Sequence, residues 1–242
     1  EYIAVDQGDI ALKPQNINFE EAASIPLVGL TSYQALHDIM QIQPGQKVMI
    51  QGGSGGIGTI AIQIAKYLGA YVATTTSADN FELVRALGAD YPIDYRTTNF
   101  AEVLSDYDYV FDTRGGKILE DAFKIIKPGG KVVSIAGLPN KRFGKEYGVP
   151  LWKQLAFGYV TRELTKLEKQ TGASYTFLFM KPSGEQLDIL GQWIEAGIIK
   201  PVIDRVVPFT EIEEALTYSK SGHATGKIIL QMTNDSQNEV NK

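Results

Sequence analysis

The chain has 242 residues, of which 44% are hydrophobic and 21% are charged, a composition typical of a globular protein with a sizeable core. Its formal net charge of -5 argues against a surface that binds nucleic acid or an anionic membrane. No apolar run approaches the roughly 18 residues that span a bilayer. Because the sequence contains no cysteine, it forms no disulfide and offers no thiolate to zinc, which favours a cytoplasmic protein.

The first clear pattern in chain order is the stretch KVMIQGGSGGIGTIAIQIAKYLGAYVATTTS, residues 47–77. Residues 47–51 predict a short strand, and residues 52–58 form a loop with five glycines. Apolar residues then recur at the i, i+3, i+4, i+7 spacing of a helix with one buried face, which Gly69 ends. Residues 70–76 are rich in β-branched side chains and predict a second strand. The stretch is therefore predicted to be a βαβ unit.

The same alternation continues along the chain. Ser77 is placed to cap a helix over 78–87, and a strand is predicted at 107–112. A helix over 119–126, a strand at 131–136, one long helix over 151–170 and a strand at 175–180 complete the predicted order. Strands and helices that alternate at this spacing indicate an α/β fold, a parallel sheet covered by helices on both faces.

The glycine loop matches the G-x-G-x-x-G pattern at Gly53, Gly55 and Gly58. In that pattern the glycines allow a tight turn, close approach of a pyrophosphate and packing of helix on strand. The pattern gains weight here because it lies between a predicted strand and a predicted helix. The loop also fits the G-x-x-x-G-x-G of short-chain dehydrogenases, but no tyrosine has a lysine four positions on, and 51 residues precede Gly52. The dinucleotide interpretation is therefore kept and the short-chain one rejected.

Five segments together resemble the medium-chain dehydrogenase/reductase superfamily, most closely its zinc-free quinone oxidoreductase (zeta-crystallin-like) branch. They are, in family order, GLTSYQAL (29–36), GGSGGIG (52–58), GADYPIDYR (88–96), FDTRGG (111–116) and SGHATGKIIL (221–230). The resemblance implies a Rossmann domain at 25–197, which adjoins a GroES-like substrate domain represented by 1–24 and 198–232. Residues 233–242 are predicted to be a disordered tail.

Relative to that family the chain begins late, so we expect it to lack the N-terminal part of the substrate domain. Four stretches, at 1–5, 10–13, 202–209 and 226–232, have the composition of strands that lie outside the parallel sheet. We expect the segments 1–24 and 198–232 to pack together as a partial GroES-like β domain.

The resemblance also implies which residues bind the cofactor. Thr31 would lie near the nicotinamide, Ser54 to Ile57 would hold the pyrophosphate, and Lys227 would approach the cofactor from the C-terminal segment. The full set of residues assigned to cofactor binding is Thr31, Ser54, Gly55, Gly56, Ile57, Thr76, Ser77, Tyr95, Ala136, Gly137, Phe179 and Lys227.

The end of the second strand indicates which nicotinamide cofactor is used. NAD enzymes commonly place an acidic residue there to bind the ribose 2′-hydroxyl. Here the sequence reads ATTTSADN, so hydroxyl groups occupy the place, and Asp79 falls in the next helical turn. Because a carboxylate would repel a 2′-phosphate, NADP(H) is the predicted cofactor. The resemblance adds Tyr95 as a phosphate contact beside Arg96, while Asn80 replaces a lysine of relatives, which predicts a modest preference.

No catalytic triad, carboxylate pair or zinc ligand set is recognisable, since His37 and His223 are the only histidines. We therefore expect hydride transfer by proximity alone, to a quinone or conjugated enone whose enolate needs little Lewis-acid help. An alcohol dehydrogenase, an enoyl reductase and a non-catalytic, crystallin-like NADPH-binding protein stay open. The partner is predicted to be a small-molecule electron acceptor, and the strand at 175–180 is expected to pair two copies into a homodimer.

Overall fold

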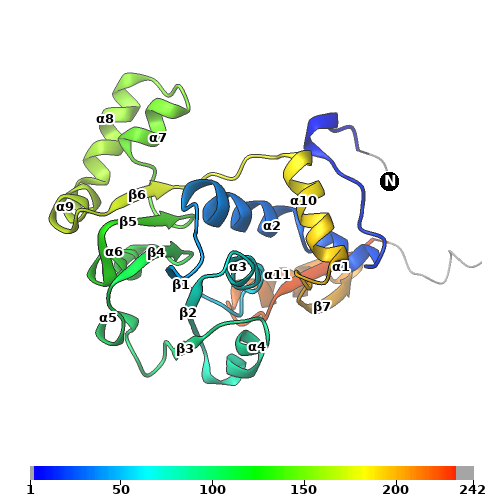
Figure 1. The fold of residues 1–242 in the computed structure, drawn as a ribbon. Coiled ribbons are helices and arrows are strands. Elements are labelled where there is room, and N and C mark those ends of the chain that lie inside the picture. The colour runs from blue at the N-terminus through cyan, green and yellow to red at the C-terminus, as the bar shows by residue number, and fades with distance from the viewer. Residues whose placement is uncertain (1–2, 233–242) are drawn as a thin grey trace, which may run out of the picture.

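The structure, a computed structural model that describes residues 3–232, is built on one six-stranded sheet (Figure 1). All of its strands run parallel, in the order β3-β2-β1-β4-β5-β6. The strands are β1 (Lys47–Ile50), β2 (Tyr71–Thr76), β3 (Tyr91–Asp94), β4 (Tyr107–Asp112), β5 (Ile126–Ser134) and β6 (Ser174–Phe177). This order confirms the predicted α/β fold with a doubly wound parallel sheet.

Helices cover both faces of the sheet, and each face has its own apolar core. Val48 and Ile50 of β1 belong to one cluster, whereas Met49 between them belongs to the other, because successive side chains of a strand point to opposite faces. The first cluster packs against α2 (Pro26–Tyr33), the π-helix η2 (Gln34–Ile39), α3 (Gly56–Tyr67), α4 (Phe81–Ala86) and α10 (Gly184–Glu195). The second packs against α5 (Phe100–Val103), α6 (Gly116–Ile125) and α9 (Arg162–Thr171).

A smaller unit lies beside the sheet. Strands β7 (Ile203–Pro208) and β8 (Lys227–Gln231) pair in parallel, joined through the short turn η4 (Phe209–Glu211) and helix α11 (Ile212–Lys220). Helix α1 (Phe19–Ala23) contacts β8. The strands predicted at 202–209 and 226–232 are therefore present.

The predicted strands at 1–5 and 10–13 are wrong over their described residues. That segment holds only a 3-10 turn, η1 (Gln7–Asp9), and its apolar side chains are exposed. A strand needs a neighbour for its backbone groups, and no strand of residues 3–232 pairs with this segment. The domain limits at 24 and 197 stay predictions, and the predicted tail lies outside the described residues.

Several boundaries differ from the sequence predictions. The strand expected at 131–136 is β5, which begins at Ile126 and ends at Ser134. The expected helix over 151–170 is two helices, α8 (Leu151–Val160) and α9, which meet at Thr161 with φ -100° and ψ 16°. Strand β6 ends at Phe177 rather than at 180. Ser77 precedes a 3-10 turn, η3 (Ala78–Asn80), and its side chain caps nothing: it accepts a hydrogen bond from the Asn80 amide instead.

Candidate functional site

A cavity of about 1160 Å³ opens at the carboxyl ends of β1, β2 and β4. The chain leaves β1 in one direction and β4 in the other, because the strand order reverses between these neighbours. Ligands of open α/β sheets bind at such a reversal point. The cavity walls come from the glycine loop, the end of β2, the segments 95–100 and 222–228, and Leu27 and Val28 of α2.

The glycine loop is shaped so that side chains would not fit. A Cβ added to Gly53 would lie 2.2 Å from the Thr74 hydroxyl oxygen, and one on Gly58 would lie 2.2 Å from the Gly52 carbonyl oxygen. Gly52 itself adopts φ +65°, a conformation that favours glycine. The loop is tied to β2, since the Gly53 N–H donates to the Thr75 carbonyl at 2.9 Å. These contacts explain why glycine is needed at each of the three positions.

The loop leads into a helix whose N-terminus has no side-chain cap. Gly55 occupies the N-cap of α3, no side chain caps the helix, and its first turn holds no acidic residue. The first N–H groups of a helix and the positive end of its dipole form a site for an anion. Because Gly55 and Gly56 line the cavity, the bare helix end fits a pyrophosphate there.

The end of β2 presents hydroxyl groups to the same cavity. The Thr76 hydroxyl donates to the Ser54 hydroxyl at 2.8 Å, and Ser77 is buried beside them. Thr76 thus joins the end of the strand to the glycine loop. The cavity wall here carries oxygen groups that can donate hydrogen bonds, and no carboxylate stands on β2 at this end.

Tyr95 and Arg96 form the outer wall next to β2. The Arg96 guanidinium pairs with the Asp79 carboxylate at 3.2 Å, and both side chains are at least half exposed. The neighbouring Tyr95 and then Asp79 raise the pKa of Arg96, which remains a cation. A phosphate group at this wall would therefore meet a cation that Asp79 partly neutralises.

The C-terminal unit closes the cavity from the other side. The Gly226 N–H donates to the Ser54 carbonyl at 2.8 Å, and Gly226 bridges to Gly55 as a single parallel β-pair. The Lys227 side chain lies across the loop, because a Cβ on Gly56 would be 2.7 Å from its Cδ atom. Lys227 thus adds to Arg96 a second cation in the cavity wall, and it lies beside the N-terminus of α3.

The structure brings together most of the residues predicted to bind a cofactor. The residues that line the cavity are Ser54, Gly55, Gly56, Ile57, Thr76, Ser77, Tyr95 and Lys227. Thr31 is buried within α2, where its hydroxyl donates to the Leu27 carbonyl at 2.7 Å, and it lies one turn beyond Leu27 and Val28, which line the cavity. Whether Thr31 contacts a cofactor stays a prediction.

The predicted residues beyond β5 and β6 lie outside the cavity lining. Ala136 and Gly137 follow β5, where Ile135 is the residue that lines the wall, and Phe179 is exposed. Whether these three residues contact a cofactor stays a prediction.

Sequence reasoning missed Arg114, which lines the cavity after β4. Its backbone N–H donates to the buried Asp112 carboxylate at 3.1 Å, and Asp112 also accepts from the Ser134 hydroxyl. These bonds fix the loop that carries Arg114. A usable signal was its position directly after the strand at 107–112, since residues at the carboxyl ends of such strands face the site.

Asp204 of β7 holds the segment 221–226 in place. Its carboxylate accepts from the Thr225 N–H at 2.6 Å, from the Tyr218 hydroxyl at 3.0 Å and from Arg205 at 3.0 Å. Burial by itself raises the pKa of Asp204, but these three donors outweigh it and hold the pKa below its ordinary value of 3.8. The ionised form is therefore favoured by the folded state.

A depressed pKa makes the contribution of Asp204 to stability depend on pH. It is fully present above the unfolded-state pKa near 3.8 and is lost as the pH falls through the lower folded-state pKa. We expect Asp204→Asn to lower the free energy of unfolding by about 1–2 kcal/mol at neutral pH and by much less at the lowest pH. Thermal unfolding across that range measures it, with the exposed Asp188→Asn as control. An equal loss at every pH would contradict the prediction.

No group of three or more His, Cys, Asp or Glu side chains that could hold a metal ion occurs in residues 3–232. No helix within this part of the chain is long and apolar enough to cross a membrane.

Comparison with solved structures places the fold among oxidoreductases. A quinone oxidoreductase from Coxiella burnetii superposes with a TM-score of 0.77 at 27% identity, over 91% of this chain and 63% of that chain. The CurK enoyl reductase gives a TM-score of 0.75 at 26% identity, over 91% and 65% respectively.

Curated proteins that are similar in sequence are also oxidoreductases. The NADPH-dependent alkenal/one oxidoreductase of Arabidopsis thaliana is 34% identical over 95% of this chain and 52% of its own length. The 2-methylene-furan-3-one reductase of Solanum lycopersicum is 33% identical over 95% and 51%. The chain thus spans about half the length of these relatives. A family model described as zinc-binding dehydrogenase matches residues 87–230, more than half of the chain. The chain therefore belongs to the zinc-binding dehydrogenase family, within the medium-chain dehydrogenase/reductase superfamily that its sequence resembles.

Proposed function

We propose that this protein is an NADPH-dependent oxidoreductase that reduces quinones or conjugated enones and alkenals by direct hydride transfer without zinc. The observation that carries the proposal is the cavity itself. It joins the bare N-terminus of α3 to the hydroxyl-lined end of β2. One end fits a pyrophosphate, and the other fits a ribose phosphate better than a ribose diol.

Each wall of the cavity has a role in this proposal. The backbone N–H groups that start α3, with Ser54, hold the pyrophosphate. Thr76, Ser77 and Tyr95 surround the 2′-phosphate, and Arg96 supplies positive charge. Lys227 adds a second cation over the glycine loop. Bound NADPH supplies the hydride, and the protein's contribution is to hold its reactive ring in one orientation.

The substrate class is supported by the relatives and by chemistry. The relatives named above act on alkenals, enones or quinones according to their names. In such acceptors conjugation spreads the charge that hydride transfer creates, so a Lewis acid contributes less than it does for a simple carbonyl. The sequence also offers only two histidines and no cysteine as soft ligands for zinc.

NADPH consumption with a panel of quinones, enones, enoyl thioesters and aldehydes tests the proposal. We expect turnover with conjugated acceptors and little with saturated aldehydes, unchanged by chelators. Turnover with aldehydes alone would favour an alcohol dehydrogenase, and tight NADPH binding without any turnover would favour a non-catalytic protein. A cytoplasmic location remains part of the proposal, although some relatives are named as chloroplastic or mitochondrial.

The ion pair between Asp79 and Arg96 gives a prediction about cofactor choice. Asp79→Asn leaves Arg96 free to pair with a phosphate, so we expect NADPH to bind a few-fold more tightly while NADH affinity stays unchanged. Dissociation constants for both cofactors measure this effect. Glu102→Gln is the matched control, because Glu102 also lines the cavity but does not pair with Arg96. Equal gains in both variants would show that only net charge matters.

A further inference from the structure

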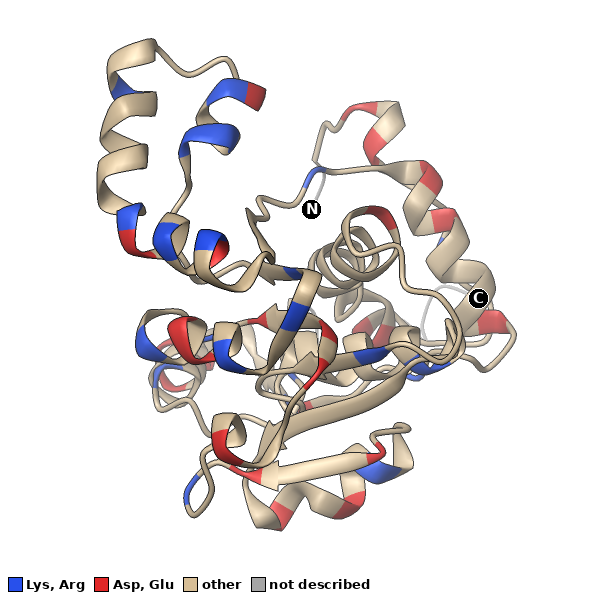
Figure 2. Cartoon of the chain, turned by 60° about the vertical axis from the view of Figure 1, so that its left-hand side comes forward, with Lys and Arg blue, Asp and Glu red and all other residues tan. Residues whose placement is uncertain are grey.

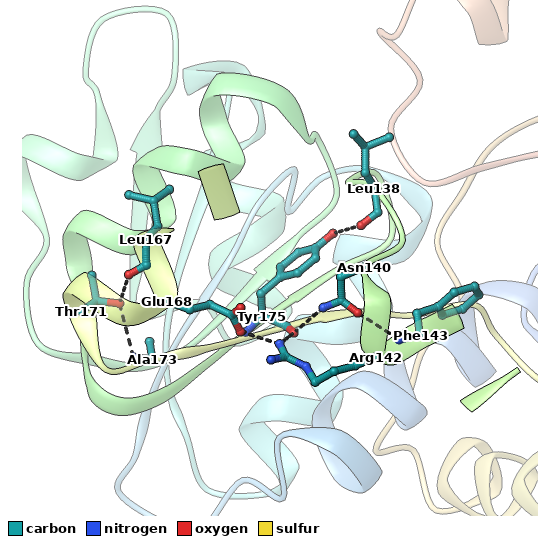
Figure 3. A network of polar contacts seen from close by, with 9 residues as sticks. All are labelled: Leu138, Asn140, Arg142, Phe143, Leu167, Glu168, Thr171, Ala173 and Tyr175. Carbon is teal, nitrogen blue, oxygen red and sulfur yellow. Dashed lines mark hydrogen bonds and ion pairs between the residues drawn. The ribbon is translucent and has the colours of Figure 1, made fainter. Parts of the chain in front are cut away.

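The loop that follows β5 rests on a buried tyrosine of β6 (Figure 3). The Tyr175 side chain is almost fully buried, and its hydroxyl donates to the Leu138 carbonyl at 2.8 Å. A Cβ added to Gly137 would lie 2.4 Å from the Tyr175 hydroxyl oxygen, so the loop backbone lies directly against this group. Burial raises the pKa of the Tyr175 hydroxyl well above its ordinary value, which keeps the hydroxyl a donor. The path of residues 136–138 therefore depends on Tyr175.

Side chains of two neighbouring helices fix the position of Tyr175. Its N–H donates to the Glu168 carboxylate at 2.7 Å, and its carbonyl accepts from the Arg142 guanidinium at 2.7 Å. Glu168 lies on α9 and Arg142 on α7 (Lys141–Glu146), two helices with charges of both signs (Figure 2), and the two side chains form an ion pair. These bonds occupy the outer edge of β6, where the pairing of two copies expected at 175–180 stays a prediction. Because its N–H and its carbonyl are both held, Tyr175 is a rigid support for the loop.

A buried serine at the end of β5 holds the same loop. The Ser134 hydroxyl accepts from the N–H groups of Gly137 at 2.8 Å and Ala136 at 3.2 Å. It also donates to the Asp112 carboxylate, which in turn accepts from the Gly115 N–H at 2.9 Å. Ser134 and Asp112 are both fully buried. The loops that follow β4 and β5 are thus joined by one buried polar network.

The strand order places these two loops beside the half of the cavity that the adenosine phosphate does not need. In the proposed function the pyrophosphate lies at the end of β1 and the 2′-phosphate at the end of β2. Because the strand order runs β2-β1-β4-β5, the other half of the dinucleotide would extend over β4 and β5. Arg114 and Ile135, at the ends of these two strands, line the cavity there. The nicotinamide ring would therefore lie beside the loop that Tyr175 supports.

We propose that Tyr175 is a positioning residue, whose hydroxyl fixes the backbone of residues 136–138 against the nicotinamide ring of bound NADPH. The inference rests on the proposed function, since it requires NADPH in the cavity. Tyr175 acts through the loop and is not among the residues that line the cavity. Its hydroxyl should thus set the orientation of the ring, on which the rate of hydride transfer depends steeply, and should contribute little to NADPH affinity.

Tyr175→Phe tests this role, because the substitution removes the hydroxyl and keeps the aromatic ring in the core. Reduced nicotinamide is fluorescent, so the time-resolved anisotropy of bound NADPH measures the motion of the nicotinamide ring without any turnover. We expect the nicotinamide to move more freely in the variant, while the dissociation constant of NADPH changes by less than about 2-fold. In single-turnover reduction of a conjugated enone, the rate of hydride transfer should fall about 10-fold.

Tyr109→Phe is the matched control. Tyr109 is also buried, and its hydroxyl donates to Gln46 at 3.1 Å, but Gln46 precedes β1 at the opposite end of the sheet. Circular dichroism and thermal unfolding should show that both variants are folded. Tyr109→Phe should keep the native anisotropy of bound NADPH and the native rate of hydride transfer.

Three results would overturn the proposal: native motion of the nicotinamide in Tyr175→Phe, equal changes in both variants, or a loss of NADPH affinity as large as the loss in rate. A native protein that binds no NADPH would overturn it together with the proposed function. A native protein that binds NADPH and reduces no acceptor would count against the proposed enzyme alone, and the anisotropy measurement would then decide the role of Tyr175.

Discussion

Thr76→Asp is expected to abolish the preference for NADPH over NADH. The new carboxylate would stand at the end of β2, within the wall that now presents the Thr76 and Ser54 hydroxyls. Two negative charges a few ångströms apart in a partly enclosed site repel each other by about 1–3 kcal/mol, so NADPH affinity should fall by about 10- to 100-fold. NADH, which lacks the 2′-phosphate, should lose little.

Dissociation constants for both cofactors, measured by fluorescence titration of the native and variant proteins, test this prediction. Thr76→Asn is the matched control, since it has nearly the same shape as the aspartate variant without the charge. We expect the native protein to bind NADPH more tightly and the asparagine variant to keep most of that difference. Equal native affinities, or a ratio that the carboxylate leaves untouched, would show that the 2′-phosphate lies elsewhere.

Gly58→Ala is expected to weaken cofactor binding strongly. The added Cβ would lie 2.2 Å from the Gly52 carbonyl oxygen and 2.6 Å from the Gly53 Cα atom, so the loop backbone itself must move. Such a shift misaligns the N–H groups at the start of α3. We expect NADPH affinity to fall at least about 10-fold and the free energy of unfolding to drop by about 1–3 kcal/mol.

Gly191→Ala separates this effect from a general effect of substituting a helical glycine. Gly191 lies within α10, and its added Cβ would meet nothing closer than Pro14 at 3.6 Å. This variant should bind NADPH normally and gain about 0.5–1 kcal/mol in stability. Normal NADPH binding by Gly58→Ala would mean that the glycine loop does not hold the pyrophosphate.

The part of the fold that the sequence predicted best is the β1-α3-β2 unit, because its strands are buried and its helix has a strict apolar period. Strand β3 was missed, since Pro92 weakens the strand pattern and is tolerated only because β3 is an edge strand. The strands predicted at 1–5 and 10–13 were wrong although their composition suits a strand. A strand also needs a neighbouring strand to pair with, and composition does not show whether one is present.

The candidate site divides in the same way. Ser54, within the glycine motif, and Thr76, at the end of the strand that follows it, could be predicted because the motif fixes where both lie. Arg114 and the covering position of Lys227 depend on how distant segments meet, which no local pattern contains. Thr31 lies one turn beyond Leu27 and Val28 on the same face of α2, and whether it contacts a cofactor stays a prediction.

The single backbone bond from Gly226 to Ser54 joins segments that are far apart in the sequence. The β7–β8 unit does not extend the main sheet, and this junction is one of the places where the two are held together directly. A molecule that touches both the loop and Lys227 would favour the docked arrangement by the free energy of its own binding. Binding of a molecule in the cavity and docking of the β7–β8 unit are therefore thermodynamically coupled. As cofactor concentration rises, the unit should become more resistant to proteases.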